Sequence, residues 1–440
     1  MISPRYFIRL ATTFITRFKE LIFLGIFIGI LFFLIFKLFL SSYETRQIEK
    51  IGAVGRYRLD NLPLSITNLI GEGLTKLDNN GLIQPALAGS WSSPDNCKTW
   101  IFKIKPEKYW QDGKKVTSGG IVYQFSDATI ERPDEETIIF KLQNQFAPFP
   151  EVVSRPTFRK GLLGTGNWKV VKVSIVGNFV ENITLVDKSK NKKIYKFYPT
   201  EERTKLAYKL GQVNKLVDIV NKDIFTGWRN VIINEEVNIN RIVAIFFNTE
   251  DKLLSEKSLR QSLAYGIDKN LLSKARTISP ISPNSWAYNA QVKPYNYDTA
   301  RAKELIADLP KDLLAKASVR LVTIPVLLPV AEKIAKNWEA LGIKTIVQVS
   351  SGVPSEFQAF LAIFDTPQDP DQYAIWHSTQ LNTNITHYKN PRIDKLLEDG
   401  RTQLNQAERK KTYLDFQRFL VEDSPAVFLY HPTLYTIERK

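Results

Sequence analysis

Residues 318–349 read SVRLVTIPVLLPVAEKIAKNWEALGIKTIVQV. Val319–Ile324 and Lys344–Val349 are runs of strand length, and Pro329 fits the first turn of a helix between them. Two strands joined by a helix in this way lie parallel in one sheet. The segment therefore predicts a βαβ unit and an α/β fold.

Further strands and helices are expected on both sides of this unit. The strand-like runs are Trp100–Ile104, Thr137–Leu142 and Phe357–Phe364. Asp298, Asn390 and Asn405 each precede a helical apolar repeat, and we expect them to be N-cap residues. Ser255 is expected to cap another helix. The apolar stripe of that helix consists of Leu259, Leu263, Ile267 and Leu271.

The composition restricts the class of protein. The chain has 440 residues, 60 Lys and Arg against 45 Asp and Glu, a net charge of +15 and 44% hydrophobic residues. This apolar content excludes an intrinsically disordered chain, and the length predicts two or three domains. A single cysteine, Cys97, excludes an intrachain disulfide and a cysteine-based zinc cluster. Because the chain also has only three histidines, we expect no metal site and no cofactor.

The positive charge has two explanations. It is consistent with a basic surface that is merely solvated, and with attraction towards anions such as lipid headgroups, cell-wall polymers or nucleic acid. The densest run, Lys188–Lys193, lies between two strand-like segments and is expected to form a hairpin loop. No aromatic residues alternate with these lysines, so we expect no nucleic-acid partner.

An apolar segment lies near the N-terminus. Leu21–Phe36 contains no charged residue, and Leu38–Leu40 extends the run past Lys37. About 20 helical residues span about 30 Å, the thickness of the hydrocarbon layer of a membrane. We therefore expect an uncleaved transmembrane helix over residues 21–40. A cleaved signal peptide is the alternative, although the residues after Leu40 form a poor cleavage site.

The cations around this segment predict its orientation. Those before it are Arg5, Arg9, Arg17 and Lys19, and no acidic residue occurs before Glu20. Because cationic segments stay in the cytoplasm, residues 1–20 are expected inside the cell, and residues 41–52 are expected to be a linker outside it. The chain is thus expected to be a single-pass protein of the cell membrane with its bulk outside the cytoplasm.

Common catalytic signatures are absent from the sequence. It contains no GxSxG, HExxH or GxxxxGK[ST] pattern. Asp365, Asp369 and Asp371 are close in the sequence, and such a cluster suits either acid–base chemistry or a turn. We expect no catalytic residues and no enzymatic activity.

A series of phrases in a fixed order carries a resemblance to one family. It includes LRQSLAYGID at 259–268 and DPDQYAIWHS at 369–378. The other phrases lie at 69–78, 81–91, 95–104, 110–117, 164–168, 280–288, 390–397 and 407–430. Through them the chain resembles the extracytoplasmic solute-binding proteins of family 5, the oligopeptide-, dipeptide- and nickel-binding subunits of ABC importers.

The resemblance implies a periplasmic-binding-protein-like fold of two α/β lobes that close on a ligand. Lobe I is expected over residues 53–246, closed by residues 428–440, and lobe II over residues 247–427. A change in pattern near residue 247, from strands and turns to clearer helices, agrees with this division. The segment between Phe125 and Thr137 is shorter than usual in the family, so we expect a reduced third subdomain.

The same resemblance supplies candidate ligand-binding residues. In peptide-binding relatives an aspartate before the DP turn pairs with the α-amino group of the peptide. Asp365 is the nearest match here, and Asp369 is the alternative. The candidate residues of the cleft wall are Trp286, Tyr288, Trp376, His377, Glu72, Gly73 and Leu74. Core packing is the competing interpretation for the aromatic residues, and a turn at the end of a strand is the competing interpretation for Asp365.

We therefore expect a membrane-anchored substrate-binding subunit of an ABC importer. It would bind a peptide or a similar small solute between its lobes, and its partners would be the permease subunits. A transport-independent sensor or scaffold of the cell envelope is one alternative on the same fold, and a binder of cell-wall polymers is another.

Overall fold

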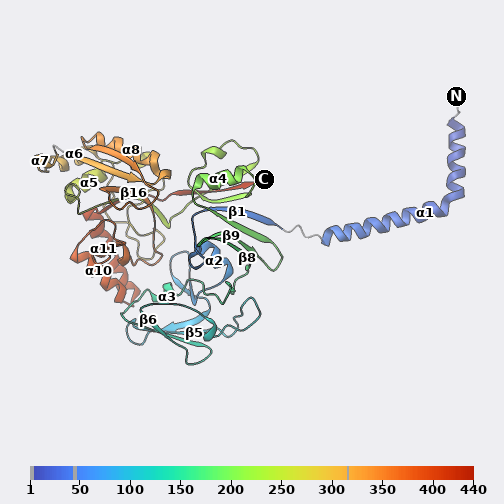
Figure 1. Ribbon diagram of the computed structural model, residues 1–440, viewed down its shortest axis with the longest axis horizontal. Coiled ribbons are helices and arrows are strands. Elements are labelled where there is room, and N and C mark those ends of the chain that lie inside the picture. Colours follow the sequence, from blue (N-terminus) through green and yellow to red (C-terminus); the bar gives the residue numbers. More distant parts are fainter. Residues whose placement is uncertain (1–3, 43–46, 315–316) are drawn as a thin grey trace.

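The computed structural model describes residues 4–42, 47–314 and 317–440, with only the backbone of residues 4–11 and 38–42. A seven-stranded sheet and a five-stranded sheet each form the centre of one lobe, and a small β subdomain lies below them in Figure 1. The expected two-lobed α/β fold is confirmed.

The first lobe is built on a sheet with the strand order β12-β18-β11-β1-β10-β9-β8. Its strands are β1 (Ile48–Val54), β8 (Lys169–Val176), β9 (Phe179–Val186), β10 (Lys192–Tyr198), β11 (Lys215–Ile219), β12 (Val231–Val237) and β18 (Thr433–Arg439). β1 is parallel to both of its neighbours, β10 and β11. The helices α2 (Leu64–Ile70) and α4 (Glu201–Lys209) bury apolar side chains against this sheet.

The small subdomain has an aromatic core. Its strands are β2 (Thr75–Leu77), β3 (Ile83–Pro85), β4 (Ala88–Ser92), β5 (Thr99–Ile104), β6 (Ala128–Glu131) and β7 (Thr137–Leu142), and α3 (Phe149–Val152) packs on them. Trp100, Phe102, Phe140 and Phe149 are buried together. Because this cluster is separate from the cores of the two sheets, the subdomain has its own hydrophobic core.

The second lobe contains the predicted βαβ unit, with the sheet order β15-β14-β16-β13-β17. Its strands are β13 (Arg241–Phe247), β14 (Ser318–Thr323), β15 (Lys344–Val349), β16 (Ala359–Asp365) and β17 (Ala426–Tyr430). Its helices are α5 (Lys257–Tyr265), α6 (Thr299–Ala307), α7 (Lys311–Leu314), α8 (Leu328–Glu339), α9 (Tyr373–Trp376), α10 (Pro391–Thr402) and α11 (Gln406–Asp423). β14 and β15 are parallel and α8 connects them, which confirms the prediction.

Three of the four expected caps are confirmed. The cap expected at Ser255 is wrong, because Glu256 precedes α5 without a side-chain cap bond and Ser255 Oγ donates to Lys252 O. The side chains of Asp298, Asn390 and Asn405 accept hydrogen bonds from the first turns of α6, α10 and α11. The helix expected after Ser255 is shorter than its apolar stripe, since α5 ends at Tyr265 and Leu271 is exposed. The chain turns here because the buried Lys269 ammonium donates to two carbonyl oxygens, of Ala264 and of Tyr295, each at 2.6 Å. The prediction of a longer helix was wrong.

The chain passes between the two sheets twice. It crosses from β12 to β13 at residues 238–240 and from β17 to β18 at residues 431–432. Asn238 N donates to Pro432 O at 2.9 Å, so the two crossings are joined. The division at residues 246/247 and 427/428 remains a proposal about the lobes; in the structure β13 and β17 are strands of the second sheet.

The N-terminal helix α1 covers Pro4–Ser42 and projects from the body (Figure 1). Its segment Thr12–Lys37 is long and apolar enough to cross a membrane, and none of it is buried in the rest of the structure. A membrane anchor and a signal sequence share these properties. Residues 1–3 of the expected cytoplasmic segment and 43–46 of the expected linker lie outside the described residues.

Candidate functional site

Charged and polar side chains from both lobes meet at the strand ends beside the crossings. Tyr57 follows the carboxyl end of β1, and Asp218 lies near the carboxyl end of β11. In the second lobe Asp365 is the last residue of β16 and pairs in register with Arg241, the first residue of β13. Ligands of open α/β sheets bind outside the carboxyl ends of the strands. We call these four residues the hinge cluster.

The hinge cluster contains one ion pair, and its other members influence that pair through their charge. Arg241 Nε donates to Asp365 Oδ1 at 2.7 Å. Burial alone would lower the pKa of Arg241, but the hydrogen bond and charge of Asp365, together with Asp218 and Tyr57, raise it overall. Burial raises the pKa of Tyr57, which stays a neutral phenol and donates to Val54 O at 3.0 Å. Two carboxylates and one guanidinium leave the cluster with one excess negative charge.

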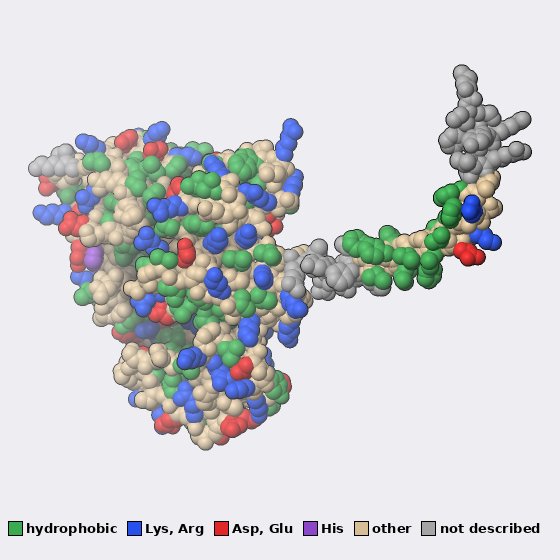
Figure 2. All heavy atoms as spheres, turned by 45° about the vertical axis from the view of Figure 1, so that its right-hand side comes forward, with side chains coloured by type: hydrophobic (Ala, Val, Ile, Leu, Met, Phe, Trp, Pro, Cys, Tyr) green, Lys and Arg blue, Asp and Glu red, His purple; other side chains and the backbone are tan. Residues whose placement is uncertain are grey.

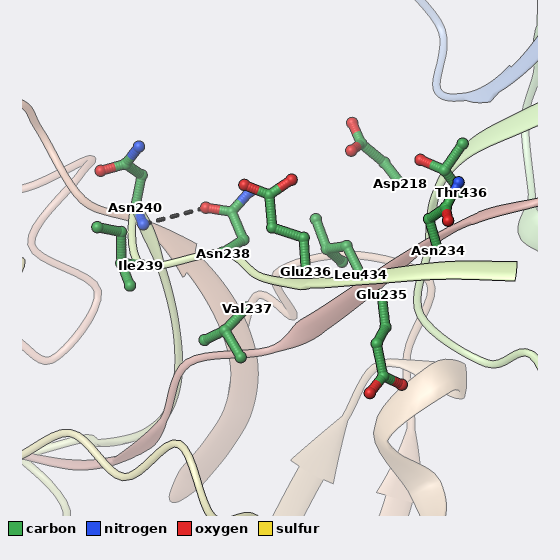
Figure 3. Close-up of a pocket in the computed structure, with 10 residues that line it drawn as sticks. All are labelled: Asp218, Asn234, Glu235, Glu236, Val237, Asn238, Ile239, Asn240, Leu434 and Thr436. Carbon is green, nitrogen blue, oxygen red and sulfur yellow. Dashed lines mark hydrogen bonds between the residues drawn. The ribbon is translucent and has the colours of Figure 1, made fainter. Parts of the chain in front are cut away.

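A polar pocket of about 270 Å³ adjoins this cluster (Figure 3). Its lining residues are Asp218, Asn234, Glu235, Glu236, Val237, Asn238, Ile239, Asn240, Leu434 and Thr436. Figure 3 shows the side chains of Asp218, Glu236 and Asn238 on one side of the strands, and those of Glu235 and Val237 on the other. The pocket therefore extends the negative surface of the hinge cluster along the crossing between β12 and β13.

The structure places Asp365 at the expected end of a strand. Its side chain is 79% exposed, and Arg241 is its ion-pair partner. Oδ1 receives that hydrogen bond, and within the described residues Oδ2 accepts no hydrogen bond, so a ligand could bind Oδ2 while the pair with Arg241 stays intact. This position is compatible with the expected role, which remains a prediction.

Asp369, the alternative candidate, has a different environment. Its side chain is 8% exposed and accepts from Arg409 Nη1 at 2.6 Å and from Nη2 at 2.5 Å. Such a bidentate pair, closed off from solvent, ties the segment after β16 to helix α11. In this conformation Asp369 offers no free oxygen to a ligand of the hinge cluster.

The Asp369 pair belongs to a buried group of charges where the small subdomain meets the second lobe. Glu151 of α3 lies beside Asp369, Asp371 and Arg409, and Arg401 Nε donates to Asp371 at 2.9 Å. Burial raises the pKa of Glu151 to about 8, and the negative charge of Asp369 adds to this effect. Burial likewise raises the pKa of Asp371, against the opposing charge of Arg401. We call these five residues the interlobe ionic cluster.

Trp376 and His377 lie inside the second lobe. Trp376 is 1% exposed, packs between Phe246 and Phe428, and donates through Nε1 to Gln372 Oε1 at 2.8 Å. His377 is also buried and stacks on Tyr373, with 4.0 Å between the ring centroids. In this conformation both side chains are packed in the core, as the competing interpretation states, and do not line an open cleft.

Trp286 and Tyr288 are half-buried on the loop before α6. The Trp286 ring packs edge-on against Tyr413, and the Arg409 guanidinium lies 5.5 Å from its centroid. Burial raises the pKa of Tyr288. Trp286 thus neighbours the interlobe ionic cluster, and within the described part of the chain no hydrogen bond or ring contact joins either residue to the hinge cluster.

Glu72, Gly73 and Leu74 belong to the small subdomain. Glu72 is half-buried and pairs with Lys108 at 2.6 Å, and Leu74 is fully buried in the aromatic core. Gly73 packs against the backbone of Val153 and Ser154, since a Cβ atom there would lie 2.4 Å from the carbonyl oxygen of Ser154. Only Glu72 presents a polar side chain that is partly exposed.

Three members of the hinge cluster were missing from the sequence-based set: Tyr57, Asp218 and Arg241. Arg241 and Asp218 each lie at one end of an apolar strand, which is a signal that the sequence contains. The sequence does not reveal that these ends converge, because this depends on how the chain crosses between the sheets. The resemblance supplied Asp365 without the arginine that pairs with it.

A two-lobed α/β protein with a charged cluster where its lobes are joined has the architecture of hinged solute-binding proteins. The comparison with protein families identifies the group more closely. The model of the family described as bacterial extracellular solute-binding proteins, family 5, middle, matches residues 122–384. The chain belongs to this family, as its sequence phrases predicted.

Relatives and solved structures agree with this assignment. The chain is 23% identical to the oligopeptide-binding protein AppA of Bacillus subtilis, over 87% of this chain and 86% of that protein. Its fold is similar to NikZ of Campylobacter jejuni in complex with Ni(L-His), with a TM-score of 0.72, 23% identity, and coverage of 89% and 94%. It is also similar to DppA of Helicobacter pylori in complex with the peptide STSA, with a TM-score of 0.69, 19% identity, and coverage of 91% and 95%.

Proposed function

We propose that this chain is the membrane-anchored substrate-binding subunit of an ABC importer and that it binds short peptides with a free amino terminus. The observation that carries the proposal is the hinge cluster, in which both lobes contribute carboxylates around one arginine. Relatives whose names describe oligopeptide and dipeptide binding support the choice of ligand. The chain would bind its ligand without altering it chemically.

The charges of the hinge cluster suit a peptide amino terminus. The two carboxylates of Asp365 and Asp218 and the guanidinium of Arg241 sum to a charge of −1, so a single ammonium group neutralises the site. The second oxygen of Asp365 is the proposed acceptor, and a bond between an ammonium and a carboxylate is about twice as strong as a neutral hydrogen bond. The guanidinium nitrogens of Arg241 other than Nε are donors for the first peptide carbonyl.

Closure follows from the position of this cluster. A ligand that contacts Tyr57 and Asp218 on one side and Arg241 and Asp365 on the other binds both lobes at once. It stabilises the closed state only by its higher affinity for that state. The permease subunits would recognise the closed form as the loaded one.

The proposed anchor is helix α1. Its segment Thr12–Lys37 is exposed in the structure although it is apolar, and a lipid environment would remove this surface from water. With its N-terminus inside the cell, the helix would hold the lobes on the outer side of the membrane. Tethering raises the local concentration of the subunit near its permease.

Peptide titrations of the D365N variant test the assignment. Replacing Asp365 by Asn removes the acceptor charge and retains the shape of the side chain. A hydrogen bond to a charged group contributes about 1.5–3 kcal/mol, so affinity for a free-amine peptide should fall roughly 10- to 100-fold. Affinity for the same peptide with an acetylated amino group should change little. Tryptophan fluorescence or calorimetry measures both.

The matched control is Asp415→Asn, which removes an exposed, ion-paired carboxylate from helix α11, away from the hinge. It should leave both affinities unchanged. If D365N lowers the affinity for acetylated and free-amine peptides equally, the loss comes from breaking the Arg241–Asp365 ion pair, and Asp365 does not bind the amino group. If no peptide from two to nine residues long binds the native chain, the peptide assignment itself is wrong.

A further inference from the structure

A lysine-rich surface lies at the end of the seven-stranded sheet where the chain leads towards α1. Its exposed cations are Lys50, Lys188, Lys190, Lys192, Arg439 and Lys440, which we call the tether-side surface. Figure 2 shows Lys and Arg side chains on the part of the body from which α1 projects. None of these residues belongs to the hinge cluster or to the interlobe ionic cluster.

Hydrogen bonds hold the lysine-rich turn beside the first residues of the body. Residues 187–191 connect β9 to β10, as the sequence predicted for this run. Lys192 N donates to Gln47 O at 2.9 Å, and Gln47 N donates to Asn191 Oδ1 at 3.2 Å. The turn is therefore fixed next to the residue that immediately precedes β1.

The C-terminus lies on the other side of the same strand. Asn214 Nδ2 donates to Ile48 O at 3.3 Å, and Arg439 N donates to Asn214 O at 3.0 Å. Lys440 follows directly and is exposed. Cations from distant parts of the sequence thus flank the start of β1 on both sides.

The carboxylates near these cations have other partners. Asp187 accepts two hydrogen bonds from Asn191 within the turn, and Glu49 and Glu438 pair with lysines inside the sheet. Within the described ranges of the chain, Lys188 and Lys190 of the turn and Lys192, the first residue of β10, have no ion pair. Because its partner Asn191 is neutral, Asp187 offsets one of the six positive charges, and the described part of this surface keeps a net positive charge.

The length of the connection keeps this surface close to the end of α1. Helix α1 ends at Ser42 and β1 begins at Ile48. Six Cα–Cα steps reach at most about 22 Å. The Debye length is about 8 Å at physiological ionic strength, so the lysines attract a charged membrane surface once they come within that distance of it. A short tether makes such an approach frequent.

We propose that the tether-side surface docks on anionic lipid headgroups of the membrane into which α1 inserts. The inference rests on the proposed anchoring by α1 and adds a second, electrostatic attachment. It also sets the orientation of the body. The hinge cluster follows the opposite end of β1, about 20 Å away along the strand, so docking holds the ligand site away from the bilayer.

Fluorescence energy transfer on the full chain in vesicles tests this proposal. Asn230→Cys places a dye beside Lys440, and the native Cys97 is buried and does not compete for the label. A second dye is carried by the lipid. Transfer should be higher in vesicles of phosphatidylcholine with phosphatidylglycerol than in phosphatidylcholine alone. It should fall to the phosphatidylcholine level as salt is raised from 0.1 to about 1 M, because the Debye length shortens to about 3 Å.

A triple variant removes the charge of the turn and keeps its backbone. It is K188Q/K190N/K192Q, with Asn at position 190 because φ is +65° there and Asn tolerates this conformation. Each lysine near an anionic surface favours docking about fivefold, so the ratio of docked to undocked protein should fall roughly a hundredfold. The control K303Q/K333Q/K344Q removes three exposed lysines of the second lobe and should leave the transfer unchanged.

Three outcomes would overturn the proposal: equal transfer in both kinds of vesicle, an equal loss in the control variant, or a triple-variant effect seen only with a soluble polyanion. Retention by phosphatidylcholine vesicles at high salt reports insertion of α1 separately. If the chain is not retained there, the anchoring proposal fails. Salt-sensitive binding to anionic vesicles still decides whether the tether-side surface recognises headgroups.

Discussion

Replacing Arg409 by methionine should destabilise the second lobe strongly. Methionine retains most of the apolar stem of arginine but removes the guanidinium. Asp369 would then be a buried carboxylate without its partner, and the carbonyl of Gly400 would lose the bond from Arg409 Nε, which is 2.7 Å long. Breaking a buried ion pair from one side costs about 3–5 kcal/mol.

Helix α11 offers a matched control. Arg418 pairs with Asp415 at 2.8 Å, one turn apart on the surface, and its side chain is 59% exposed. An exposed pair of this kind contributes about 0.2–1 kcal/mol. Arg418→Met is the same substitution on the same helix. The difference in destabilisation between R409M and R418M therefore reports the effect of burying the ion pair.

Thermal unfolding followed by calorimetry distinguishes the two variants. For a lobe of this size each kcal/mol shifts the midpoint by about 2–4 °C, so R409M should unfold roughly 10 °C below the native chain and R418M within about 4 °C of it. Adding Asp369→Asn to R409M removes the stranded charge and should recover part of the loss. Equal shifts for R409M and R418M would refute the reasoning, as would a double variant less stable than R409M.

Two further predictions concern the contact between the small subdomain and the second lobe. The pKa of Glu151 is raised from 4.5 to about 8, so the folded chain retains a proton that the unfolded chain loses, and stability should fall as pH rises from about 5 to 8. Glu151→Gln should flatten this dependence in melts at several pH values, whereas the exposed Glu131→Gln should not. Burial raises the pKa of the Cys97 thiol to about 11, and Cys97 Sγ donates to Thr402 O across the contact at 3.7 Å. Thiol labelling should therefore be slow and slower still with bound ligand; rapid labelling of the liganded chain would contradict this.

Much of the second lobe could be predicted because its signals are local. The βαβ unit and the caps at Asp298, Asn390 and Asn405 depend on residues within one or two turns of each other. The helix after Ser255 was predicted too long because its apolar stripe continues through Leu271. Tertiary contacts end it earlier, since Lys269 bonds to the carbonyl of Tyr295, which no local pattern contains.

The site was less predictable for a related reason. Asp365 was found through the family resemblance, but the arginine opposite it comes from a strand 124 positions away in the sequence. Asp369 and Trp376 have residue types that occur in clefts and in cores alike. Only packing distinguishes the two environments, and the structure shows both side chains buried.

On the proposed closure, the two charged clusters would respond differently to a ligand. Glu151 lies beside Asp369 and Arg409, so the chain's own charges form a contact between the small subdomain and the second lobe. The hinge cluster, in contrast, has two carboxylates and one guanidinium, which leaves one excess negative charge. A ligand shifts the equilibrium between the open and closed forms only if it binds one form more tightly than the other. Its apparent affinity is proportional to the fraction of the free protein that is already in the form able to bind. Ionisation of Glu151 would place a third carboxylate beside Asp369 and Asp371 and weaken this contact, so on the proposed closure we expect rising pH to shift the free chain towards the open form.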